Sequence, residues 1–156
     1  MRSLFIVTLL LSLSACDSAE EQVTTPYKPT TEMINLMNWI MDPAADGIWL
    51  NSGWEITDQG ERELFPTDEE GWQKMVNAAA MVAESGNLLM IPGRENGIDG
   101  RGEDWVVYSQ AIVDTGNLLL EAAQAKDKQA VFDLGGRLYQ VCLACHQRYA
   151  FPEQER

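Results

Sequence analysis

The chain has 156 residues, of which 46% are hydrophobic, and a formal net charge of -13 at pH 7. A chain of this length forms one ordinary hydrophobic core, so a single folded domain is expected. The acidic excess repels phosphate backbones and argues against nucleic-acid binding. It suits a basic partner or simple solubility equally well.

Residues 1–15 have the three-part pattern of a secretory signal peptide. One positive charge at Arg2 precedes an apolar run over residues 4–13, which is too short to span a bilayer as a mature helix. The sequence "LSAC" at residues 13–16 resembles the bacterial lipoprotein cleavage motif, in which the cysteine becomes the lipid-bearing first residue. The alternative is an ordinary signal peptide in which Cys16 is a stray thiol.

Lipidation of Cys16 implies a membrane anchor without a spanning helix, since each buried acyl CH₂ contributes about 0.8 kcal/mol. Asp17 resembles the signal that retains such lipoproteins on the outer face of the inner membrane. We therefore expect an exported protein on the periplasmic side of a bacterial membrane, with the inner membrane favoured. Residues 16–30 are expected to be the lipidated cysteine and a flexible, polar tether, and residues 31–156 the folded domain.

The first helix is predicted to begin at Thr31. Methionines recur every four residues along it, at Met33, Met37 and Met41. Pro43 is expected to start a second helical segment at an angle to the first, because proline favours the first turn of a helix. A tryptophan-rich loop that contains Trp49 and Trp54 is expected to follow, with residues 51–66 as its main part.

Three longer helices are predicted from apolar residues at helical spacing, over residues 67–90, 104–127 and 126–149. Thr67 and Glu70 have the spacing of a capping box at the start of the first of these. A glycine-rich loop is expected at residues 93–102. No stretch alternates with period two for long enough to predict a strand. The predicted fold class is therefore all-α, most simply an antiparallel four-helix bundle.

Glycines inside the predicted helices need a reason, because each costs about 1 kcal/mol relative to alanine. Gly86 and Gly116 are expected to allow close approach of a neighbour or a bulky ligand. The alternative is that isolated helical glycines are simply tolerated. Gly135 and Gly136 weaken the prediction of the last helix.

Cys142, Cys145 and His146 share one face of the last predicted helix. A structural zinc site needs four ligands, and the only further Cys or His in the chain is Cys16. A thioredoxin-like C-x-x-C should open a helix after a strand, whereas this one ends a helix. In an exported protein, C-x-x-C-H is the attachment signal for one c-type haem, with both thiols joined to vinyl groups and His146 on the iron.

A haem motif in the last helix of a helical bundle resembles the cytochrome c prime family, the class II c-type cytochromes. The resemblance covers residues 31–150, and "VCLACHQRY" at 141–149 matches the family pattern Cys-x-x-Cys-His-x-x-Tyr. It implies a four-helix bundle with haem on the last helix, Tyr149 at the family's aromatic position, and pairing of two copies. Departures are the bend at Pro43, the tryptophan-rich loop and the acidic tail at 151–156.

The ligand on the other side of the iron decides the function. His146 is the only histidine, so a second imidazole from the same chain is excluded. In the resembling family the first helix crosses this distal face and presents either an apolar residue or a methionine. Met37 is the expected ligand and Met33 the runner-up, although methionines at helical spacing are usually core filler.

His/Met ligation predicts an electron carrier that exchanges electrons with redox partner proteins and is not an enzyme. An empty distal position predicts a five-coordinate protein that binds small gases such as nitric oxide, as the five-coordinate members of the family do. A third alternative is an accessory protein in which the haem is structural.

Overall fold

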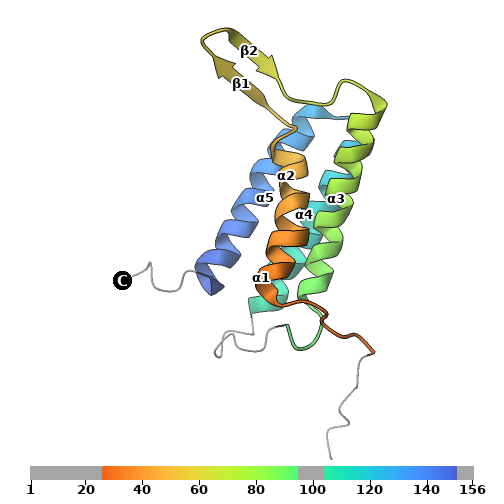
Figure 1. Cartoon of the computed structure of the whole chain (residues 1–156), viewed down its shortest axis with the longest axis vertical. Coiled ribbons are helices and arrows are strands. Elements are labelled where there is room, and N and C mark those ends of the chain that lie inside the picture. Colours follow the sequence, from red (N-terminus) through yellow and green to blue (C-terminus); the bar gives the residue numbers. More distant parts are fainter. Residues whose placement is uncertain (1–25, 95–103, 151–156) are drawn as a thin grey trace, which may run out of the picture.

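The computed structural model describes residues 26–94 and 104–150, which form long helices with a hairpin at one end (Figure 1). The predicted signal peptide, Cys16, most of the tether and the acidic tail lie outside the described residues. The prediction of a mostly helical fold is confirmed. None of the described helices combines the length and the apolar character needed to cross a membrane.

Three helical segments follow one another without interruption at the start of the domain. They are α1 (Met33–Leu36), the π-helical turn η1 (Met37–Met41) and α2 (Asp42–Trp49). In η1 the backbone N–H of Asp42 donates to the carbonyl of Met37, five residues back. Pro43 lacks a donor and its ring crowds the carbonyl four residues earlier, so the wider turn accommodates it within a continuous helical run. The expected second segment at Pro43 is therefore α2, and Trp49 ends this helix instead of lying in a loop.

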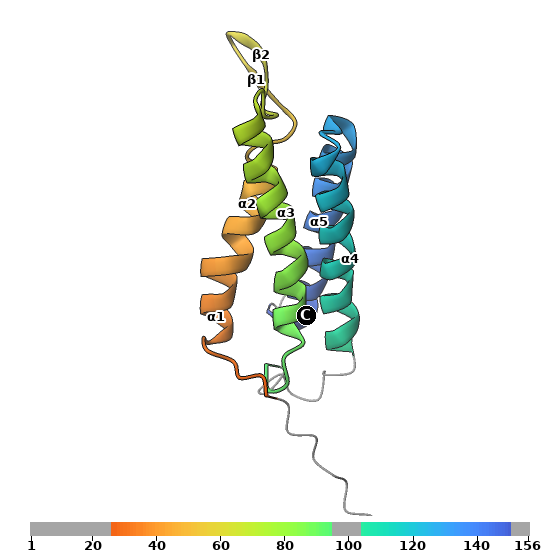
Figure 2. The same cartoon turned by 90° about the vertical axis from the view of Figure 1, so that its right-hand side faces the viewer.

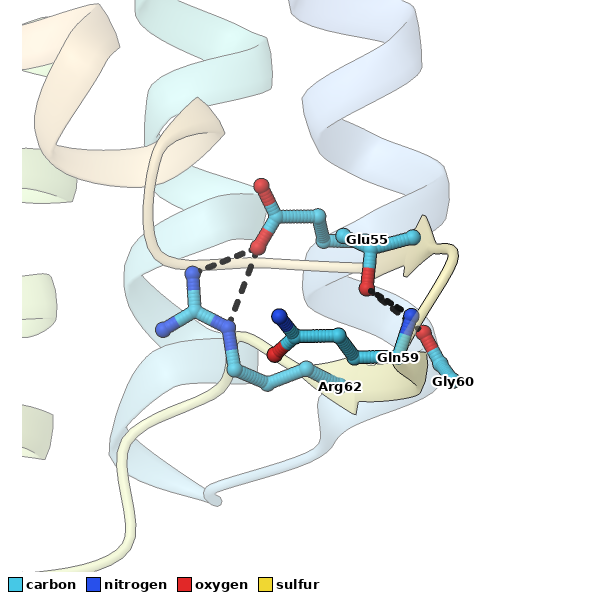
Figure 3. Close-up of polar contacts among 5 residues, drawn as sticks. Glu55, Gln59, Gly60 and Arg62 are labelled. Atoms are coloured by element: carbon cyan, nitrogen blue, oxygen red, sulfur yellow. Dashed lines mark hydrogen bonds and ion pairs between the residues drawn. The ribbon is translucent and has the colours of Figure 1, made fainter.

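The segment expected to be a loop at residues 51–66 contains an antiparallel hairpin. Its strands are β1 (Trp54–Thr57) and β2 (Gly60–Glu63). Gly60 has a φ of +123°, which favours glycine and allows the tight turn. Arg62 faces Glu55 across the hairpin and donates from Nε and Nη2 to the same carboxylate oxygen, at 3.0 and 2.6 Å (Figure 3).

The remaining helices are α3 (Glu69–Leu89), α4 (Trp105–Gln124) and α5 (Lys128–Tyr149). α2 packs against α3 and α5, and α4 packs against α3 and α5 on the opposite side of the molecule (Figure 2). The predicted capping box is wrong, because Asp68 caps α3 by accepting a hydrogen bond from the Gly71 N–H at 2.8 Å. Long apolar side chains fill the core between the helices, among them Leu36, Ile48, Met75, Leu119 and Leu138.

Gly86 and Gly116 lie where α3 and α4 touch. A Cβ atom added to Gly116 would lie 2.5 Å from the backbone nitrogen of Ala83, and one added to Gly86 would lie 2.8 Å from the Ser109 carbonyl oxygen. Their predicted role in close approach is confirmed, and the neighbour is a helix, not a ligand. Gly136 differs, because a Cβ there would meet open space.

Candidate functional site

The candidate site is a cavity of about 290 Å³ between the first helical run and α5. α5 contributes Cys142, Cys145 and His146, and the facing η1 contributes Met37 and Met41. Side chains of α3 and α4, all apolar except one serine, form the remaining walls. The structure thus brings together the three residues of the C-x-x-C-H motif and the expected distal methionine.

The motif faces the cavity because its residues lie on one stripe of α5. Leu138, Cys142 and Cys145 follow one another at spacings of four and three residues, and His146 follows Cys142 by four. Leu138 and Cys145 are buried, whereas Cys142 and His146 are half-buried. Both sulfur atoms and the imidazole are therefore available to one ligand in the cavity.

Interactions between α2 and α5 define the register of the two helices, that is, which residues of one lie opposite which residues of the other. At one end, Trp49 Nε1 donates to the Gly135 carbonyl at 2.9 Å, and its ring lies 6.2 Å from that of Tyr139. At the other end, the carboxylate of Asp42 lies near enough to the Cys142 thiol to raise its pKa. The two helices run in opposite directions (Figure 1). Residue numbers therefore decrease along α5 in the direction in which they increase along α2.

This register distinguishes the three methionines. Met37 precedes Asp42 by five residues and His146 follows Cys142 by four, so this register places Met37 near the level of His146, and both line the cavity. Met41 lies about one helical turn away, near the level of Cys142. Met33 lies a further turn beyond Met37 and lines a separate, polar pocket with Arg94.

Both motif thiols are shielded from water. Burial, with a smaller contribution from the Asp42 carboxylate, raises the pKa of Cys142 to about 11. Burial, with a smaller contribution from Cys142, raises the pKa of Cys145 to about 11 as well. Thiols of catalytic disulfide exchange have lowered pKa values, so these properties weigh against that alternative.

Tyr149 lies outside the cavity, in the last turn of α5. Its ring packs edge-on against Trp105 and Tyr108 of α4, with centroid distances of 5.1 and 5.9 Å. Trp105 is itself buried and donates from Nε1 to the Leu89 carbonyl at 2.8 Å. Tyr149 therefore fixes the end of α5, one turn beyond His146, against α4.

The donor set of the cavity fits a covalently attached haem. Across residues 26–94 and 104–150, no group of three or more His, Cys, Asp or Glu side chains could hold a bare metal ion. Two thiols and one imidazole on the same stripe, opposite a thioether in an apolar cavity, instead match a macrocycle that brings its own four nitrogen ligands. The cavity is at the small end of the range for ligand pockets, so it would enclose only part of such a ring.

Several cavity residues were missed by sequence reasoning. The sequence does not predict Asp42 as a site residue and predicts Trp49 as part of a loop, yet both line the cavity together with the exposed Tyr139. Ser85 of α3 also lines it, and its buried hydroxyl donates to the Val82 carbonyl at 2.7 Å. Asp42 and Trp49 lie seven residues apart, which is the helical spacing that could have revealed their shared face.

Comparisons with protein families, with curated proteins and with solved structures gave no match to this chain. Its function is therefore inferred from the C-x-x-C-H motif and from the geometry of the cavity around it.

Proposed function

We propose that the protein is a c-type cytochrome that carries electrons and is similar to the cytochrome c prime family. One observation supports this above all: Cys142, Cys145 and His146 line the same apolar cavity as Met37, from opposite walls. In this proposal the helices form the family's four-helix bundle, with one haem attached to α5.

Four cavity residues have a defined role in the proposal. Cys142 and Cys145 would hold the haem covalently: each S–H would add across one vinyl group, with the sulfur bonded to one vinyl carbon and the hydrogen to the other. His146 of α5 and Met37 of η1 would hold the iron. The haem supplies a one-electron couple, and His/Met ligation raises its reduction potential and leaves no open coordination position.

The other walls exclude water from the proposed haem. Val82 and Leu89 of α3 and Ile112 of α4 line the cavity, and all three are buried. An apolar shell disfavours the additional positive charge of the oxidised iron, which also raises the reduction potential. These features suit outer-sphere electron transfer and not catalysis on a bound substrate.

The proposal places the protein on the periplasmic side of a bacterial membrane, the inner membrane being favoured. The "LSAC" sequence supports lipidation at Cys16, and the polar residues after it support a tether that lets the domain reach redox partner proteins. Tyr149 supports the site from outside by holding the last turn of α5. Pairing of two copies, as in relatives of this family, is part of the same proposal.

The alternative function is binding of a small gas such as nitric oxide. It requires that Met37 leave the distal side of the iron. Met37 is half-buried, and the exposed residues Asp42 and Tyr139 form part of the cavity lining, so the cavity has a route to solvent. These two observations support gas binding as the alternative function.

The absorption spectrum separates the two functions. The purified protein would be measured oxidised, reduced with dithionite, and reduced under carbon monoxide. Sharp α and β bands that carbon monoxide leaves unchanged are expected for a His/Met electron carrier. A broad high-spin spectrum that shifts with the gas would favour gas binding, and the absence of any haem spectrum after expression with the c-type maturation system would contradict both.

A further inference from the structure

We propose that the surface beside the cavity, formed by one face of α2 and one face of α5, docks a redox protein with a basic surface. This inference rests on the proposed function and specifies the site at which the partner binds. The surface is called the α2/α5 face below. Its acidic residues are Asp42, Asp46 and Asp133, and its aromatic residues are Trp49, Phe132 and Tyr139.

The α2/α5 face is continuous with the cavity. A shallow groove of about 470 Å³ runs along it, and Trp49 and Tyr139 line both this groove and the cavity. Gly135 and Gly136 of α5 also line the groove, and a Cβ on Gly136 would meet nothing within 4 Å. A partner seated in the groove is therefore separated from the cavity by two aromatic side chains.

The face exposes apolar area of the kind found at the centre of protein interfaces. Phe132 and Tyr139 are 44% and 53% exposed, and Leu50, next to Trp49, is 69% exposed. Phe132 also contacts Trp54 of the hairpin, with ring centroids 5.4 Å apart, which extends the aromatic area beyond the helices. Aromatic residues are enriched at interfaces relative to the rest of a protein surface.

The charges around this apolar centre identify the kind of partner. Asp42, Asp46 and Trp49 share one face of α2 by their spacing, and both aspartates are exposed. Neither aspartate forms an ion pair with a described cation. The ion pairs of the described residues involve other acids, at Glu55, Glu63, Glu69, Glu70 and Asp104. The carboxylates beside the cavity are thus free to attract lysines and arginines of a partner, which accelerates association.

The test uses the haem-loaded protein and a basic mitochondrial cytochrome c as the probe. A double variant, Asp46→Lys with Asp133→Lys, reverses two charges of the α2/α5 face. The control is a second double variant, Asp114→Lys with Glu121→Lys, on α4. The pairs are matched, because Asp133 and Asp114 each accept from a glutamine four residues earlier at 3.0 Å, and all four acids are exposed. α4 lies on the side of the molecule away from α2 (Figure 2). None of the four lines the cavity.

The second-order rate constant for electron transfer is measured against ionic strength. The double variant of the α2/α5 face is expected to lower this rate constant about tenfold or more at low ionic strength. The double variant on α4 is expected to lower it by less than about threefold. Equal losses in both pairs, or no loss in either, would overturn the docking surface. The spectrum and reduction potential are measured for every variant, so a protein without a low-spin haem contradicts the proposed function instead.

Discussion

Asp42 and Cys142 line the same cavity, and the Asp42 carboxylate contributes to the raised pKa of the Cys142 thiol, which is consistent with one antiparallel register of the first helical run and α5. The hydrogen bond from Trp49 to the Gly135 carbonyl fixes the same register two turns farther along α2. Because both relationships agree, this register places Met37 near the level of His146, and both residues line the cavity. The position of a candidate axial ligand therefore follows from contacts that lie outside the C-x-x-C-H motif.

Replacing Met37 by alanine tests this position directly. We expect Met37→Ala to convert the oxidised haem from low to high spin and to allow the reduced haem to bind carbon monoxide, because the sixth ligand is lost. Met33→Ala is the matched control, since Met33 is also half-buried but lines a different pocket. If Met37→Ala keeps the wild-type spectrum while Met33→Ala or Met41→Ala loses it, the distal ligand lies on a different turn of the helix and the assignment to Met37 is wrong.

Close packing of α3 on α4 predicts opposite effects for two glycine substitutions. Gly116→Ala places a methyl group 2.5 Å from the Ala83 backbone nitrogen, so overpacking is expected to lower the free energy of unfolding by about 1–3 kcal/mol. Gly136→Ala meets open space and is expected to raise it by about 0.5–1 kcal/mol through helix propensity. Urea unfolding of samples with equal haem content measures both. Two substitutions that change stability in the same direction would contradict the packing described here.

The helices and the motif face were predictable because their signals are local. Apolar residues at helical spacing predicted the long helices, and the spacing of Cys142, Cys145 and His146 predicted one shared face. The hairpin was missed because its strands are only four residues long, and alternation in "WEIT" is too short to distinguish a strand from a loop. It depends on the turn at Gly60 and on the contact between Trp54 and Phe132, which joins distant parts of the chain.

The register of α2 on α5 was not predictable for the same reason. Nothing in the local sequence indicates that Asp42 and Cys142 line the same cavity or that Trp49 donates to the Gly135 carbonyl. The sequence therefore predicted a methionine stripe but could not state which methionine faces His146. The π-turn at Met37–Met41 was likewise missed, since the pattern around Pro43 fits either a break in the helix or a wider turn.

The lipid anchor predicts a change of cell fraction on substitution of one residue. Cys16→Ser is expected to move the protein from the membrane fraction to the soluble periplasmic fraction, because serine cannot carry the thioether-linked lipid that anchors the chain. Ser18→Ala serves as the control and should remain with the membranes. Fractionation followed by immunoblotting measures both. Membrane retention of Cys16→Ser would show that the chain is held by something other than acyl chains on this cysteine.

The buried thiols predict a pH dependence of the haem-free protein. Burial raises the pKa of Cys142 and Cys145 to about 11, from an ordinary value of 9.0. The folded state then binds more protons than the unfolded state between these values, so the contribution of the thiols to stability falls as pH rises from about 9 to 11. Unfolding free energies across this range measure the effect. A Cys142→Ser, Cys145→Ser double variant lacks both thiols and should lose less stability.

Alkylation by iodoacetamide gives an independent measurement of the same shift. At pH 8 the folded, haem-free protein should react more slowly than the protein in urea, since only the thiolate is nucleophilic. The folded rate should then rise until about pH 11, where the pKa values of the two thiols lie. Asp42→Asn should increase reaction at Cys142 more than at Cys145, because the Asp42 carboxylate adds to the shift of Cys142. Equal rates in the folded and unfolded protein at pH 8 would mean that the thiols face solvent, which contradicts their burial in the cavity.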